Sequence, residues 1–156
     1  MKYTAILALF TIAATARVIE LDLSSPTQFN EIQEANINDV VMMKLPENPT
    51  TGYSWLLVNR PSIDIQCLAL SKVEYFPNNN HQDEFFGAGG IKYYNFLAKQ
   101  AGSETVEFIS SHIWDKQNYT DAATGRVDVA HYISNDPNAK HVQVKFLVSG
   151  TPSFLA

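Results

Sequence analysis

The sequence predicts an all-β protein built as an antiparallel β-sandwich, and two observations carry this prediction. Apolar and polar residues alternate along most of the 156-residue chain, as in strands with one buried face. Turn residues separate these runs about every eight to twelve residues, a spacing typical of sandwiches. A partly open barrel is the alternative. Because a sandwich gathers its loops at the two ends of its sheets, loops distant in sequence can form one surface.

The individual strands are placed by alternation and by the turn residues that flank each run. Residues 29–37 are ambiguous, because their apolar positions have helical spacing in a short run. Residues 63–75 hold one or two strands, and residues 135–138 have the composition of a hairpin connection. The remaining strands are expected at 18–23, 40–45, 53–58, 91–98, 105–109, 127–133 and 142–148.

Residues 1–16 have the organisation of a secretory signal peptide. Lys2 supplies the positive start, an apolar segment follows, and Ala14–Ala16 has the small-x-small form of a cleavage site. The apolar segment is too short to span a membrane. A buried N-terminal helix is the alternative. We expect cleavage after Ala16, which leaves a single domain over residues 17–156. We expect the protein in the secretory pathway, either secreted or within a lysosome-like or phagosomal vesicle.

Charge and cysteine content exclude several classes of function. The formal net charge is −5 and basic runs are absent from the sequence, so we expect neither a nucleic-acid nor a membrane partner. Cys67 is the only cysteine, so an internal disulfide is impossible. Its apolar surroundings predict a buried, inert thiol. A Cys67-based enzyme is disfavoured, because no helix N-terminus that would lower the thiol pKa is predicted beside it.

The remaining polar residues do not suggest metal or acid–base chemistry. None of the histidine pairs has the spacing of a zinc site, although His131 and His141 could face each other across the last hairpin. The Asp83-Glu84 pair is typical of solvated loop charge. We therefore expect no metal ion and no cofactor.

The segment 48–55, Asn-Pro-Thr-Thr-Gly-Tyr-Ser-Trp, is the most informative part of the chain and is called the octet loop here. Pro49 fixes its own φ and holds Asn48 extended, and Gly52 can adopt a positive φ. Between them, Thr50 and Thr51 offer hydroxyl groups on stiff side chains. Such a loop loses little entropy when it docks into a cleft. An ordinary connecting turn is the alternative, since turns use the same residues.

Two further loops carry unusual residues. The segment 85–90, Phe-Phe-Gly-Ala-Gly-Gly, is called the glycine loop here, and its glycines allow close approach of another backbone. The third loop begins at Ser111-His112-Ile113-Trp114, where the tryptophan is either a lid on the core or an exposed anchor. Asn118-Tyr119-Thr120 is a glycosylation sequon, and both a glycosylated and an unmodified Asn118 fit the sequence.

Taken in order, these loops resemble the chagasin family, the protein inhibitors of papain-like cysteine peptidases. The resemblance rests on Asn48–Tyr53, then Gly87-Ala88-Gly89-Gly90, then Trp114, and it extends from about Ile37 to Trp114 and again over the last strand. The chain departs from the family at His112-Ile113, where the family usually has Arg-Pro. The segment 115–139 is also longer than the corresponding connection in the family.

The resemblance implies an immunoglobulin-like sandwich whose three loops form a wedge for the peptidase cleft. The inhibitor would be reversible and non-covalent, not an enzyme, and a monomer whose partner is a papain-like, cathepsin-like cysteine peptidase. Thr50 would lie nearest the catalytic cysteine with Thr51 beside it. The other residues implied to bind the peptidase are Asn48, Pro49, Gly52, Tyr53, Gly87, Ala88, Gly89, Gly90, His112, Ile113 and Trp114.

One alternative function belongs to a different class. A sandwich module could bind a glycan or a cell-surface protein through the same loops. Inhibition of papain would distinguish the two readings.

Overall fold

A computed structural model describes residues 16–24, 31–78, 89–112 and 114–150. Within these ranges eight strands, one α-helix and two short 3-10 helices follow each other along the chain. The elements are β1 Val18–Asp22, β2 Gln33–Asn36, β3 Val40–Glu47, η2 Pro49–Thr51, β4 Tyr53–Leu57, β5 Leu68–Pro77, β6 Gly90–Ala98, β7 Gly102–His112, η3 Lys116–Tyr119, α1 Val129–Asn135 and β8 Lys140–Ser149. Residues 1–15, which hold most of the expected signal peptide, lie outside the described residues.

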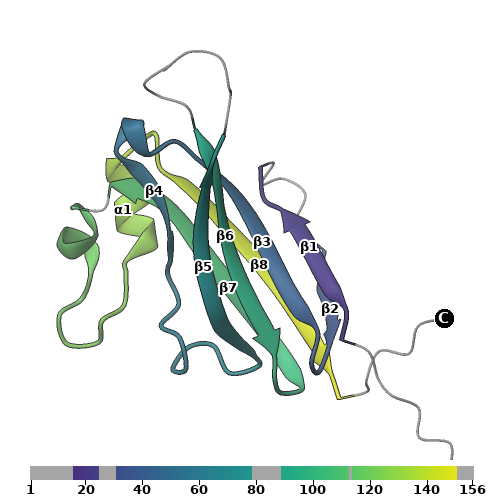
Figure 1. Cartoon of the computed structure of the whole chain (residues 1–156). Helices are drawn as coiled ribbons and strands as arrows, with labels where there is room; N and C mark the ends of the chain where they lie inside the picture. Colours follow the sequence, from purple (N-terminus) through teal and green to yellow (C-terminus); the bar gives the residue numbers. More distant parts are fainter. Residues whose placement is uncertain (1–15, 25–30, 79–88, 113, 151–156) are drawn as a thin grey trace, which may run out of the picture.

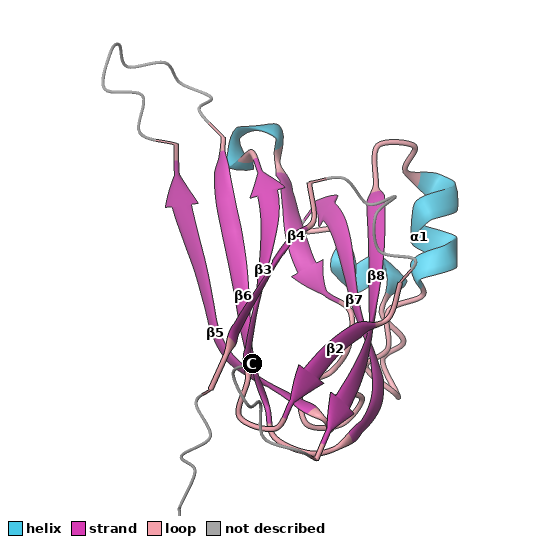
Figure 2. Ribbon diagram, turned by 90° about the vertical axis from the view of Figure 1, so that its right-hand side faces the viewer, coloured by secondary structure: helices cyan, strands magenta, loops and turns pink. Residues whose placement is uncertain are grey.

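The strands form two four-stranded sheets packed face to face, as Figures 1 and 2 show. The first sheet has the order β1-β3-β6-β5 and the second has the order β2-β8-β7-β4. The predicted all-β, immunoglobulin-like sandwich is confirmed. The central pairings are antiparallel, but β1 pairs with β3 and β2 pairs with β8 in parallel. Alternation predicts a half-buried strand but not the direction of its neighbour, so the parallel pairing of β1 and of β2 was not predicted.

The core lies between the inner faces of the two sheets. Val41, Met43 and Leu45 alternate along β3 and are fully buried, as the period-two pattern requires. Side chains from β6 in the same sheet, and from β7 and β8 in the facing sheet, complete the core. These residues are Phe96, Val106, Phe108, Val144 and Phe146. The core holds without a disulfide, and Cys67 is buried directly before β5.

The segment after the third loop differs from the prediction of a strand at 127–133. Residues 129–135 form helix α1, because the Asp128 carboxylate caps its N-terminus by accepting the His131 N–H at 3.0 Å. Tyr132 is buried at 2% exposure, whereas Val127 forms only an isolated bridge with Thr120. The predicted hairpin at 135–138 is therefore the exit of the helix into β8. None of the described helices is long and apolar enough to cross a membrane.

Two other strand predictions are narrowed by the structure. Of the ambiguous residues 29–37, only Gln33–Asn36 form a strand, and 29–30 lie outside the described residues. Of residues 63–75, the first part turns back on itself and the strand begins at Leu68.

Candidate functional site

Strand register brings the predicted loops to one end of the sandwich. Glu47 at the end of β3 pairs with Gly90 at the start of β6, and Pro77 at the end of β5 pairs with the same glycine. In the second sheet, Tyr53 at the start of β4 pairs with His112 at the end of β7. The octet loop therefore crosses between the sheets at the end where the glycine loop and the third loop are attached (Figure 2). Gly87, Ala88 and Ile113 lie outside the described residues.

Internal hydrogen bonds close the octet loop into a single 3-10 turn. Asn48 caps the turn, because its side-chain oxygen accepts the Thr50 N–H at 3.2 Å and the Thr50 hydroxyl at 2.7 Å. The Thr51 hydroxyl donates to the Asn48 carbonyl at 2.7 Å. Pro49, Thr50 and Thr51 are exposed. Both threonine protons are used inside the loop, so each hydroxyl oxygen can act toward a partner only as an acceptor. The Thr51 oxygen already accepts the Tyr53 N–H at 3.4 Å.

Gly52 ends the turn and brings the octet loop against the third loop. Its φ is +81°, in the left-handed region that glycine adopts without strain, and its N–H donates to the Pro49 carbonyl at 3.0 Å. A Cβ at this position would come within 2.8 Å of Trp114 Cη2 and 3.1 Å of His112 Cδ2. Glycine is therefore needed here for two separate reasons, its backbone angle and the close approach of the two loops.

Three aromatic rings continue this contact across the two loops. The Tyr53 and His112 ring centroids lie 4.0 Å apart, and the His112 and Trp114 rings stack at 4.6 Å with planes 15° apart. His112 Nδ1 lies 3.3 Å from an Asp115 carboxylate oxygen. Trp114 ends the row with 64% of its surface exposed. The structure thus favours the exposed anchor over the core lid for this tryptophan.

The described end of the glycine loop lies against the other side of the octet loop. A Cβ on Gly89 would lie 3.1 Å from the Glu47 carbonyl oxygen and 3.6 Å from Asn48 Cβ. The Gly89 carbonyl accepts the Asn78 N–H at 2.9 Å, and Gly90 packs tightly under the Phe76 carbonyl. The described parts of all three loops therefore meet at Asn48–Gly52.

A buried polar cluster beneath the octet loop was not predicted from the sequence. Glu47, whose side chain is 6% exposed, accepts the Ser54 hydroxyl at 2.9 Å and the Trp55 N–H at 2.8 Å. Lys92 Nζ lies 3.4 Å from Glu47 and donates to the Ser54 hydroxyl at 2.7 Å. The only available signal was a single lysine in the aromatic run of β6. This cluster ties both stems of the octet loop to β6.

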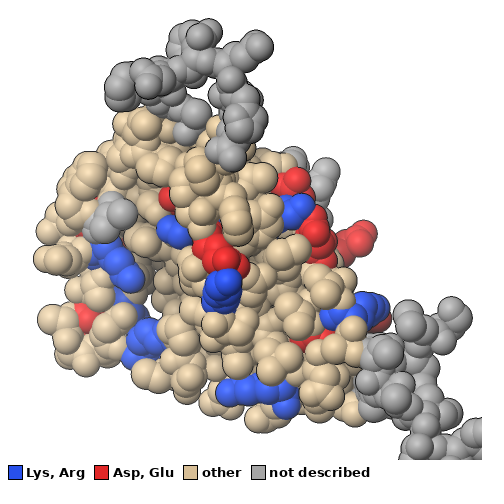
Figure 3. Space-filling view, in the orientation of Figure 1, with Lys and Arg blue, Asp and Glu red and all other residues tan. Residues whose placement is uncertain are grey.

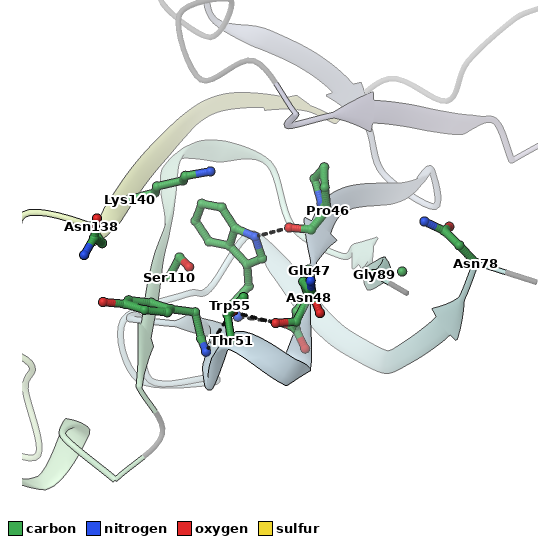
Figure 4. A pocket seen from close by; sticks show the side chains of 12 residues that line it. Pro46, Glu47, Asn48, Thr51, Trp55, Asn78, Gly89, Ser110, Asn138 and Lys140 are labelled. Atoms are coloured by element: carbon green, nitrogen blue, oxygen red, sulfur yellow. Dashed lines mark hydrogen bonds between the residues drawn. The ribbon is translucent and has the colours of Figure 1, made fainter. Parts of the chain in front are cut away.

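An open pocket of about 540 Å³ lies on the side of the octet loop that faces the sandwich (Figure 4). The Trp55 indole lies in it and donates its N–H to the Pro46 carbonyl at 2.8 Å. Asn138 and Lys140 lie on one side of the indole, and Gly89 and Asn78 on the other. The octet loop is thus open to solvent on this side. The shape of the loop depends on its own hydrogen bonds and on its contacts with the two neighbouring loops.

The comparison with known families decides between an ordinary turn and a functional one. Residues 34–129 match the chagasin family of peptidase inhibitors, I42. The chain belongs to the chagasin family. The matched range contains the octet loop, the glycine loop and Trp114, so the resemblance based on these loops is confirmed. As a chagasin-family protein, the chain is a peptidase inhibitor and not an enzyme.

Individual relatives of this chagasin-family protein agree with that assignment. Chagasin of Trypanosoma cruzi is 27% identical over 79 residues, which cover 50% of this chain and 69% of chagasin. The cysteine protease inhibitor EhICP2 of Entamoeba histolytica has a similar fold, with a TM-score of 0.54, 14% identity and coverage of 86% of this chain and 97% of EhICP2. The solution structure of amebosin gives a TM-score of 0.54, 18% identity and coverage of 86% and 100%.

The other residues considered from the sequence lie elsewhere in this chagasin-family chain. Cys67 precedes β5 at the end of the sandwich opposite the octet loop, and burial raises the pKa of its thiol. His131 packs against Tyr119, and His141 Nε2 lies 2.5 Å from Glu107, so the two histidines do not face each other. The ranges described here contain no group of three or more metal-binding side chains. Asn118 of the sequon is exposed in η3, four positions after Trp114.

Proposed function

We propose that the loop end of the sandwich enters the active-site cleft of a papain-like cysteine peptidase and blocks it reversibly, without a covalent bond. The observation that carries this proposal is the direct packing of Gly52 against His112 and Trp114, with Gly89 on the opposite side of the same turn. The parts of the wedge are therefore held together before binding. A preformed surface loses less conformational entropy on association, so more of its buried area contributes to affinity.

The octet loop is suited to occupy a catalytic centre without being cut. Its backbone is closed by bonds from the Thr51 and Gly52 N–H groups to the Asn48 and Pro49 carbonyls, so it does not offer an extended peptide to the nucleophile. The Thr50 and Thr51 oxygens can accept a hydrogen bond from a catalytic imidazolium. By its resemblance to the family, Thr50 lies nearest the catalytic cysteine and Thr51 beside it.

The flanking loops supply the contacts on the two walls of the cleft. Trp114 offers a large exposed ring, the side-chain type most enriched at binding hot spots. Residues Gly87–Gly90 allow backbone-to-backbone approach on the other wall. Three loops together can bury roughly the 1,600 Å² found in protease–inhibitor pairs. On the face that Figure 3 displays, few Lys, Arg, Asp or Glu side chains lie among the described residues at the loop end.

We place this activity in the secretory route. The support is the charge, apolar core and cleavage order of residues 1–16, together with the exposed sequon at Asn118. Expression of the whole chain in a eukaryotic cell tests both the cleavage after Ala16 and the glycosylation of Asn118. A secreted product that starts at Arg17 and loses mass on treatment with an N-glycosidase is expected. A cytosolic product that keeps residues 1–16 would contradict the proposed route.

Titration of papain with the purified chain tests the inhibitory function. We expect reversible inhibition with one inhibitor per active site, and recovery of an intact inhibitor after dilution. Thr50→Ala and Trp114→Ala together should weaken inhibition and leave the thermal unfolding of the chain close to wild type. Full papain activity at micromolar wild-type inhibitor would overturn the proposal.

A further inference from the structure

The long segment between Trp114 and β8 contacts the binding loops through the Asp136 carboxylate and the Tyr132 hydroxyl. Asp136 follows α1, and its carboxylate oxygens accept the Tyr53 hydroxyl at 3.0 and 2.9 Å. The same carboxylate accepts the Tyr132 hydroxyl at 3.2 Å. The Tyr132 oxygen in turn accepts the backbone N–H of His112 at 3.3 Å. One carboxylate is thus connected to the octet loop and, through Tyr132, to the third loop.

The chemistry of this cluster suits a fixed support. Each hydroxyl has one proton to donate, and both protons are directed at Asp136. Hydrogen bonds to a charged acceptor are stronger than those between neutral groups. Partial burial raises the pKa of Asp136, but hydrogen bonds from the Asn138 N–H, Tyr53 and Tyr132 outweigh it, and the net pKa lies below the usual range. The carboxylate therefore stays ionised in mildly acidic solution.

We propose that Asp136 is a positioning residue for the peptidase-binding loops, acting through Tyr53 and Tyr132. The inference rests on the proposed inhibitory function. The octet loop and the third loop leave different strands, and the stretch His112-Ile113-Trp114 contains no proline to stiffen it. The carboxylate after α1 sets the position of both loops from the side. The long segment 115–139 is in this view part of the binding apparatus.

A double-mutant cycle tests the proposal on inhibition of papain. Asp136→Asn and Tyr53→Phe should each weaken inhibition roughly tenfold, mainly through faster dissociation. The double variant should inhibit papain as well as the poorer inhibitor of the two single variants, because both changes remove the same contact. Asp128→Asn is the matched control, since Asp128 caps the same helix without touching the loops. It should leave both inhibition and thermal stability close to wild type, because asparagine caps a helix about as well as aspartate.

The free protein supplies a second measurement that does not depend on the peptidase. Asp136→Asn should speed hydrogen exchange of the Thr51 and Gly52 amides, which close the octet turn. Asp128→Asn should not. Additive losses in the cycle, or unchanged exchange in Asp136→Asn, would overturn the positioning role. A wild-type chain that fails to inhibit papain would overturn the proposed function instead, with the exchange result still deciding the role of Asp136.

A separate cluster at the start of β1 concerns the residue that would follow the proposed cleavage. The Arg17 backbone nitrogen donates to Asp39 Oδ1 at 3.1 Å, and its guanidinium nitrogens donate to Oδ2 at 3.2 and 3.0 Å. The Asp39 side chain is only 1% exposed. Oδ2 also accepts the Asn36 N–H at 2.9 Å. A buried carboxylate is thus already placed on the nitrogen of Arg17.

We infer that Asp39 is a receptor for the α-ammonium group that cleavage after Ala16 creates. Hydrolysis by a signal peptidase adds the oxygen of water to the Ala16 carboxyl group. The Arg17 nitrogen gains a hydrogen and then a proton, because an α-amino group has an ordinary pKa of about 7.7–8.0. The neutral amide contact with Asp39 becomes an ion pair. This inference rests on the proposed secretory leader.

Chains with defined first residues test this receptor. A chain that begins at Arg17 should unfold about 3 °C higher than one that begins at Ala16, measured at pH 6. The difference should vanish in Asp39→Asn. The α-amino group of the Arg17 chain should also be acylated several-fold more slowly than that of the Ala16 chain, a measurement that does not need the variant. Equal melting temperatures with equal acylation rates would overturn the receptor, whereas a secreted chain starting elsewhere would overturn the leader.

Discussion

Gly52 and Trp114 lie so close that a β-carbon on Gly52 would come within 2.8 Å of Trp114 Cη2. The two residues belong to different loops and are 62 positions apart in the sequence. This contact couples the shape of the octet turn to the orientation of the exposed tryptophan. A substitution at either residue should therefore alter the conformation of both the octet loop and the third loop.

Gly52→Ala should weaken inhibition at least tenfold and destabilise the fold by about 1–2 kcal/mol, the cost of a left-handed non-glycine residue. Gly125→Ala is the matched control, because Gly125 has a φ of +69° but its β-carbon would only approach Arg60 Cδ at 3.7 Å. Gly125→Ala should lower the free energy of unfolding by a similar amount and leave inhibition unchanged. Urea unfolding curves measure the first quantity and inhibition constants the second. Equal inhibition by the two variants would argue against the coupling.

Trp114→Ala should weaken inhibition by about 2 kcal/mol or more, as for an interface hot spot, with little loss of stability. The ring is 64% exposed in the free protein, so the core does not depend on it. Ile63→Ala provides the comparison, since Ile63 is 61% exposed in the connection at the opposite end of the sandwich. Inhibition should be unaffected there. A large drop in melting temperature for Trp114→Ala would instead indicate a structural role.

Lys92→Met should destabilise the protein by about 3 kcal/mol, because it leaves the Glu47 carboxylate buried without its cation. The Glu47→Gln/Lys92→Met double variant should recover part of this loss. On the outer face of the same sheet, Lys44 pairs with Glu20, and Lys44→Met should cost less than about 1 kcal/mol. Urea unfolding distinguishes these outcomes, and similar losses for the two lysine variants would contradict the buried role of Lys92.

Asp64 should contribute to resistance against acid. Hydrogen bonds from the Arg60 side chain and N–H hold its pKa well below the usual range. Because the folded pKa lies below the unfolded value of about 3.9, its stabilising contribution is complete above that pH and declines as pH falls toward the folded pKa. Asp64→Asn should therefore lower the melting temperature at pH 6, and the difference from wild type should shrink between pH 4 and 2. A constant difference would refute this linkage.

Cys67 should react slowly with a thiol reagent in the native protein and rapidly in urea, because the side chain is 7% exposed and burial raises its pKa. Cys67→Ala should leave inhibition of papain unchanged. Wild-type protein whose Cys67 has been modified in urea and then refolded should be compared with Cys67→Ala in the same inhibition assay. Loss of inhibition in Cys67→Ala would restore the thiol as a functional group.

Local patterns predicted the parts of this structure that local forces determine. The turn at Asn48–Gly52 follows from a capping side chain, a proline and a glycine in the order that a 3-10 turn requires. Alternation placed most of the strands. Residues 127–133 alternate like a strand but also have apolar residues at helical spacing, and the capping contact of Asp128 selects the helix. The Glu47–Lys92 pair depends on strand register, and the Tyr53–Asp136 contact depends on how helix α1 packs against the sandwich. A single sequence specifies neither.

The octet loop leaves β3 in one sheet and enters β4 in the other, so the breadth of the wedge is tied to the thickness of the sandwich. Gly90 and His112, where the flanking loops are attached, belong to opposite sheets that pack about 10 Å apart. Met43, Phe96 and Phe108 in the core keep that separation. These buried side chains therefore set the width of the loop end, so the width of the cleft that the proposed wedge can enter depends on residues of the core.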